Sequence, residues 1–146
     1  GVVFDPAKDE MFFAEKGTGA WMNEGRLRVS GRNRMIESIF ATGLPFGGRA
    51  DLPETLKDLG RLLPVCAGVR RWGAASLDLA YVASGRYDGF WERKLKPWDL
   101  AAGMLIAKEA GALIDTINPE RDILQHGEII CANEPIFSTF LKTIRG

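Results

Sequence analysis

Hydrophobic and polar positions alternate in short runs near the start of the chain. Residues 1–4 and 11–14 flank a turn that contains Pro6, and residues 20–22 and 26–29 form a second such pair. Proline suits a turn, and short apolar runs with polar breaks are typical of strands. The pattern predicts two antiparallel hairpins. Two hairpins are marginal in water by themselves, so we expect them to belong to a wider sheet.

From residue 38 onward, short apolar runs alternate with segments of helical periodicity, and the polar residues 31–37 lead into this region. Such alternation predicts an α/β layer. The chain is therefore expected to divide into residues 1–37, which are strands and a linker, and an α/β domain at residues 38–146. The predicted strands are residues 38–42, 65–70, 87–92, 112–115 and 129–132, and the predicted helices are residues 52–63, 73–84, 97–110 and 134–144.

Two helix starts carry capping signals. Asp51 and Glu54 have capping-box spacing before the first helix, and Asn133 is the expected cap of the last helix. The first helix should bury one apolar face, because its leucines recur at helical spacing. Those leucines are Leu52, Leu56, Leu59, Leu62 and Leu63.

Composition excludes several classes of function. The 146 residues carry a formal net charge of zero, which argues against nucleic acid as a main partner because phosphate backbones select basic surfaces. No apolar run is long enough to span a membrane. Cys66 and Cys131 lie alone in apolar runs and are expected to be buried thiols in the reducing cytoplasm. With only His126 to join them, a zinc site is not expected.

The third predicted helix begins beside a carboxylate. Pro97 restricts Lys96 to extended geometry, so Asp99 falls at the N-cap or in the first turn, and Gly111 is the expected left-handed residue after the last turn. From the residues alone, Asp99 is either a helix cap or a ligand, and the cap is the commoner role. Glu109 lies about 15 Å away along the helix and cannot share a small site with it. Glu92 can, because a loop joins it to the helix.

A family resemblance rests on this stretch. Residues 96–103, Lys-Pro-Trp-Asp-Leu-Ala-Ala-Gly, and the Glu-Ala-Gly at 109–111 resemble the C-terminal signature of the inositol monophosphatase family, and the similarity extends through residues 73–89 and the opening of the chain. It implies a mixed sheet flanked by helices and preceded by hairpins of an N-terminal sheet. The family's other metal-binding signatures, a Glu-Glu pair and an Asp-Pro-Ile-Asp-Gly-Thr-like loop, are absent. The chain is therefore expected to be the C-terminal portion of a longer protein.

The resemblance assigns roles to particular residues. Asp99 corresponds to a ligand of catalytic Mg²⁺, and Glu92 to an acidic residue that accepts a hydrogen bond from a substrate hydroxyl. The backbone of Gly73, Ala74 and Ala75 corresponds to a segment against the substrate, and Arg71 is a weaker candidate for substrate contact. Without the resemblance, Glu92 would be a strand-end surface charge and residues 73–75 a tightly packed helix start. Two further expectations are that Asp78 is a structural hydrogen-bonding residue and that Trp98 packs beneath the metal site.

The implied activity is magnesium-dependent hydrolysis of inositol monophosphate or a similar sugar or polyol phosphate. The chain alone is expected to be inactive, because it holds only part of the site. Two alternatives stay open: another phosphatase of the superfamily, acting on fructose bisphosphate, histidinol phosphate or a nucleotide 3′-phosphate, or a non-catalytic binding or regulatory protein on the same fold. A homodimer is expected, since open strand edges invite pairing.

Overall fold

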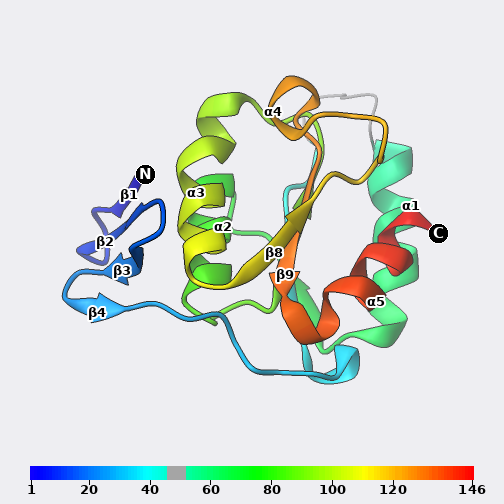
Figure 1. Cartoon of the computed structure of the whole chain (residues 1–146). Helices are drawn as coiled ribbons and strands as arrows, with labels where there is room; N and C mark the ends of the chain where they lie inside the picture. Colours follow the sequence, from blue (N-terminus) through cyan, green and yellow to red (C-terminus); the bar gives the residue numbers. More distant parts are fainter. Residues whose placement is uncertain (46–51) are drawn as a thin grey trace.

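The structure is a computed structural model that describes residues 1–45 and 52–146. Two β-sheets and the helices between and beside them form stacked layers (Figure 1). The order is a four-stranded sheet, the helices α2 (Ala75–Ala83) and α3 (Pro97–Glu109), a five-stranded sheet, and then the helices α1 (Leu52–Leu62) and α5 (Glu134–Arg145). This confirms the predicted α/β fold with preceding hairpins. Asp51, the predicted cap of the first helix, and the end of the loop after Thr42 lie outside the described residues.

The four-stranded sheet contains both predicted hairpins and is antiparallel throughout. Its first two strands alternate between buried and exposed side chains, so that Val3 and Phe12 face α2 and α3 while Phe4 and Met11 face outward. The last strand is shorter than predicted and ends at Arg26. In spatial order the strands are β1 (Val2–Asp5), β2 (Glu10–Glu15), β3 (Gly19–Met22) and β4 (Gly25–Arg26).

The five-stranded sheet is mixed. The strand β5 pairs in parallel with β6 and β7, and β9 pairs antiparallel with β7 and β8. One predicted strand is wrong at its start, because residues Leu63–Val65 form a 3-10 turn. In spatial order the strands are β6 (Gly68–Arg70), β5 (Ile39–Thr42), β7 (Gly89–Glu92), β9 (Ile129–Asn133) and β8 (Ala112–Asp115).

Both faces of this sheet are buried, which explains why its strands are apolar runs rather than alternating ones. Phe90 and Cys131 face α2 and α3, whereas the next residue of β7, Trp91, faces α1 and α5. The first of these core clusters also contains Val3 and Phe12 of the hairpins. Residues before and after position 37 thus share one hydrophobic core. The division of the chain into two domains at residue 37 stays a prediction.

The helices are α1 (Leu52–Leu62), α2 (Ala75–Ala83), α3 (Pro97–Glu109), α4 (Ile123–His126) and α5 (Glu134–Arg145), with a 3-10 turn at Met35–Glu37. The short α4 was not predicted. Asn133 caps α5 as expected, since its Oδ1 accepts from the Ile136 amide. None of the helices in the described parts of the chain is long and apolar enough to cross a membrane.

The predicted buried face of α1 is confirmed only in part. Leu62 is buried and Leu59 packs against the same core cluster, as expected. Leu52, Leu56 and Leu63 are exposed, and the polar residues Thr55 and Asp58 are buried instead. The physical reason is a polar contact that leucine spacing does not reveal: Asp58 reaches the side chains of two residues at the end of β7.

Candidate functional site

A cleft opens where β5 and β7 end and where α2 and α3 begin. Carboxyl ends of parallel strands meet at one edge of a sheet, so the loops that follow them lie together. The cleft has a volume of about 160 Å³, and one water molecule needs only ~10–15 Å³ of such space. We call it the Glu92–Asp99 cleft. Its lining contains all six predicted site residues and consists of Gly43, Leu44, Arg71, Gly73, Ala74, Ala75, Glu92, Leu95 and Asp99.

Asp99 lies in the first turn of α3, not at its N-cap. Lys96 is the N-cap, with extended backbone as expected before Pro97, and its amide donates to Asp99 Oδ2 over 2.9 Å. Within the described residues, Asp99 Oδ1 has no hydrogen-bond partner. Asp99 therefore stabilises the helix start with one oxygen and leaves the other available at the cleft.

Glu92, the last residue of β7, packs against the backbone of Gly43. A Cβ atom placed on Gly43 would collide with the Glu92 carboxylate. A side chain at position 43 would therefore displace Glu92, and the loop after β5 helps to determine where that carboxylate lies. Sequence reasoning missed Gly43, since nothing in a Gly-Leu-Pro loop indicates which side chain it faces.

The start of α2 has no side-chain cap. Ala74 is the N-cap residue with extended backbone, and Gly73 before it has φ +98°, a conformation that favours glycine. Uncapped amides at a helix start attract anions. The Arg71 guanidinium lies near Gly73, because a Cβ there would be 3.2 Å from Arg71 Nη1. This corner of the cleft can accept a negatively charged group.

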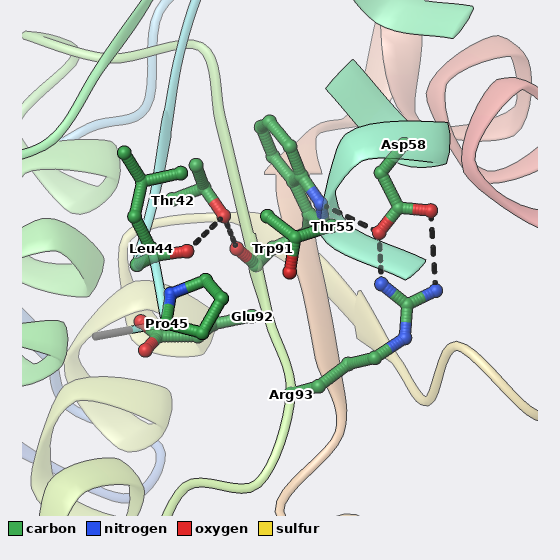
Figure 2. A pocket seen from close by; sticks show the side chains of 9 residues that line it. Thr42, Leu44, Pro45, Thr55, Asp58, Trp91, Glu92 and Arg93 are labelled. Atoms are coloured by element: carbon green, nitrogen blue, oxygen red, sulfur yellow. Dashed lines mark hydrogen bonds and ion pairs between the residues drawn. The ribbon is translucent and has the colours of Figure 1, made fainter. Parts of the chain in front are cut away.

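The two residues beside Glu92 are held by a buried carboxylate on α1. Asp58 Oδ2 accepts from Trp91 Nε1 over 3.1 Å and from the Arg93 guanidinium, whose second nitrogen donates to Oδ1 over 3.3 Å (Figure 2). Sequence reasoning also missed Asp58. The available signal was the spacing of Thr55, Asp58 and Leu62, which place polar residues on one helical face.

Two further expectations are wrong. Asp78 is 1% exposed, yet neither of its carboxylate oxygens has a hydrogen-bond partner among the described residues. Burial, and secondarily the nearby Glu92 carboxylate, raise the pKa of Asp78 to about 7, while Arg71 opposes the shift. Trp98 does not pack beneath a metal site, because it is 78% exposed.

Glu109, at the end of α3, belongs to a contact between layers. Its two oxygens accept from the amides of Gly17 and Gly19 over 2.9 and 3.0 Å. The Gly17 amide, and then that of Gly19, lower the pKa of this carboxyl. Glu109 thus attaches the second hairpin to α3, and Gly111 follows with φ +99°, as predicted for the helix end.

The donor set for a metal ion is incomplete within the described residues. They contain no group of three or more His, Cys, Asp or Glu side chains that could hold an ion. Mg²⁺ is usually held by one or two carboxylates, with waters and substrate phosphate as the other ligands. The available oxygen of Asp99 fits one position of such a site. Cys66 and Cys131 are buried free thiols, as predicted.

Comparison with known proteins decides the family. The model of the inositol monophosphatase family matches residues 1–145. The chain belongs to the inositol monophosphatase family. The match covers both the stretch that contains Asp99, which lies at the cleft, and Glu109, which attaches the second hairpin to α3.

Individual relatives agree with this membership. The chain is 43% identical over 145 residues to an inositol-1-monophosphatase of Mesorhizobium japonicum, and the aligned residues cover 99% of this chain and 54% of the relative. It is 45% identical to the Nus factor SuhB of Pseudomonas aeruginosa, with the same coverage. The crystal structure of the extragenic suppressor protein suhB from Bartonella henselae superposes with a TM-score of 0.94 at 41% identity, over 99% of this chain and 56% of that one. The chain thus spans about half the length of the relatives it matches.

Proposed function

We propose that the protein containing this chain hydrolyses a phosphate monoester of inositol or a similar polyol in a magnesium-dependent reaction. The observation that carries the proposal is the convergence of Asp99, Glu92, Arg71 and residues 73–75 on the Glu92–Asp99 cleft. These residues lie as far apart in sequence as positions 71 and 99, and only the fold brings them to one place.

Asp99 holds the metal ion in this proposal. Its available Oδ1 is a hard oxygen ligand of the kind that Mg²⁺ prefers, and the hydrogen bond that the Lys96 amide donates to Oδ2 fixes the carboxylate. A bound metal ion supplies charge stabilisation for the phosphate group and for the leaving oxygen.

Glu92 and the start of α2 bind the substrate. An ionised carboxylate only accepts hydrogen bonds, which suits it to the hydroxyls of a polyol ring. Glu92 lies at the cleft beside Gly43, and the same lining contains Arg71 and the uncapped start of α2. In this proposal Arg71 and the start of α2 bind the anionic phosphate group, and Glu92 accepts hydrogen bonds from the hydroxyls.

The chain by itself is expected to be a poor catalyst. Mg²⁺ gives up its bound waters reluctantly, and a single carboxylate oxygen displaces few of them. We therefore expect residues 1–146 to bind Mg²⁺ with a dissociation constant of roughly millimolar or weaker, and to show negligible turnover. Calorimetric titration with magnesium and a phosphate-release assay test this expectation. Robust metal-dependent turnover by the 146 residues would show that the catalytic ligands lie elsewhere in the chain.

The deciding experiment compares two variants in the full-length protein. Asp99→Asn keeps an oxygen for the Lys96 amide, so stability should persist while turnover collapses if Asp99 is a ligand. Glu92→Gln should reduce use of inositol phosphate more than use of a small aryl phosphate, since a hydrogen bond to a charged group contributes about 1.5–3 kcal/mol. Retained turnover in Asp99→Asn would refute the metal role, and equal losses on both substrates would refute hydroxyl recognition by Glu92.

Two other functions remain to be separated from this one. A superfamily phosphatase for fructose bisphosphate, histidinol phosphate or a nucleotide 3′-phosphate would show its preference in a panel of esters. A non-catalytic regulatory role is suggested by relatives named Nus factors, although zero net charge favours no direct nucleic acid contact. Absent turnover on the whole panel would favour the regulatory role. The homodimer and the cytoplasmic location stay predictions.

A further inference from the structure

Glu92 lies between two residues that share one partner. In an extended segment, successive side chains point to opposite sides, and Figure 2 shows Trp91 and Arg93 directed toward Asp58 while Glu92 points away from it. Asp58 accepts from both neighbours and lies on α1, which is on the other side of the sheet from the cleft. The direction of Glu92 is therefore coupled to a carboxylate that does not line the Glu92–Asp99 cleft.

We propose that Asp58 is a positioning residue for Glu92: by holding Trp91 and Arg93, it fixes the direction in which the Glu92 carboxylate enters the cleft. This inference rests on the proposed role of Glu92 in binding substrate hydroxyls. Asp58 itself touches neither substrate nor metal, and acts only through the end of β7.

The hydrogen bonds of Asp58 to Trp91 and Arg93 lie in a largely buried part of the protein. Asp58 and Trp91 are each 1% exposed, and the side chain of Arg93 is 17% exposed. A buried carboxylate is costly unless it is paired and hydrogen-bonded, so the three groups depend on one another. If one is removed, the end of β7 loses a partner that water cannot easily replace.

A second contact holds the same strand end from the side of β5. The Thr42 hydroxyl donates to the Trp91 carbonyl oxygen over 2.7 Å, and the next residue, Gly43, packs against the Glu92 carboxylate. Glu92 is thus fixed through its neighbours on one side of the sheet and by direct packing on the other. Recognition of a hydroxyl requires such fixation, because misplacement by about 1 Å can cost roughly 100-fold in rate.

The test uses the full-length protein and the ratio of kcat/KM for myo-inositol 1-phosphate to that for 4-nitrophenyl phosphate. In Asp58→Ala, this ratio should fall about tenfold, mainly through a higher KM for the inositol ester. Asp58→Asn keeps one acceptor and should show a smaller loss of the same kind, so it replaces Asp58→Ala if that variant does not fold. The matched control is Ile136→Val, in the same core cluster as Trp91 but without a polar link to β7, which should leave the ratio unchanged.

A double variant shows whether Asp58 acts through Glu92. Adding Asp58→Asn to Glu92→Gln should not lower the ratio further, because the positioned group is already altered. A ratio in the Asp58 variants equal to that of Ile136→Val, or additive losses in the double variant, would overturn the proposal. If Glu92→Gln alone leaves the ratio unchanged, the substrate role of Glu92 fails. The crystal structure of Asp58→Asn then decides positioning: a Glu92 carboxylate displaced from Gly43 supports it, and an unmoved one refutes it.

Discussion

Replacement of Asp78 by asparagine should stabilise the protein at neutral pH and have little effect in acid. Asp78 is almost fully buried on α2, without a hydrogen-bond partner among the described residues. Burial first, and then repulsion from Glu92, raise the pKa of its carboxyl from the ordinary 3.8 to about 7. Asparagine has the same shape and resembles the neutral acid, so the substitution removes only the cost of the charge.

The magnitude follows from proton linkage. Between pH 3.8 and about 7 the unfolded chain releases a proton that the folded chain keeps, so the free energy of unfolding falls as pH rises. The contribution of Asp78 is fully present below pH 3.8 and is lost once the pH has risen through about 7. At about 1.4 kcal/mol for each pH unit, the whole change is roughly 4 kcal/mol.

Urea unfolding of the wild type and of Asp78→Asn between pH 4.5 and 8 measures this effect. The free-energy advantage of the variant should be small at the acid end and grow steadily toward pH 7. Glu120→Gln is the control, because Glu120 is exposed and its substitution should give no pH-dependent difference. An advantage of Asp78→Asn that does not change with pH, or a loss of stability at pH 8, would refute the assignment of a buried, neutral Asp78.

Two further substitutions test other contacts. Gly43→Ala should push the Glu92 carboxylate from its place and, in the full-length protein, lower turnover of inositol phosphate more than that of an aryl phosphate; equal losses would contradict the contact. Glu109→Gln leaves one acceptor for the amides of Gly17 and Gly19, so their hydrogen exchange should accelerate. Because these amides lower the pKa of Glu109, the difference in exchange rate between the variant and the wild type should persist above pH 4.5, the ordinary pKa of a glutamate, and vanish as the pH falls through the lower pKa of the folded protein. Unchanged exchange would show that the contact is dispensable.

The sequence by itself predicted the order of the strands and of the four longer helices, although not the short α4 or the bounds of every strand. Local signals were sufficient for the extended Lys96 before Pro97 and for the left-handed Gly111. These features depend on neighbouring residues and backbone sterics alone. The residues at the Glu92–Asp99 cleft were named from a family resemblance, and the fold brings all of them together.

Only the tertiary structure decided which polar groups meet across the layers. Leucine spacing predicted only part of the buried face of α1, because the partners of Asp58 lie more than thirty positions away, at the end of β7. The same limit applies to Asp78, whose pKa depends first on burial and then on Glu92 and Arg71, and to Gly43, whose missing side chain leaves room for Glu92. Periodicity shows on which face of a helix or strand the apolar side chains lie. The free energy of a buried carboxylate depends instead on which groups the folded chain places beside it.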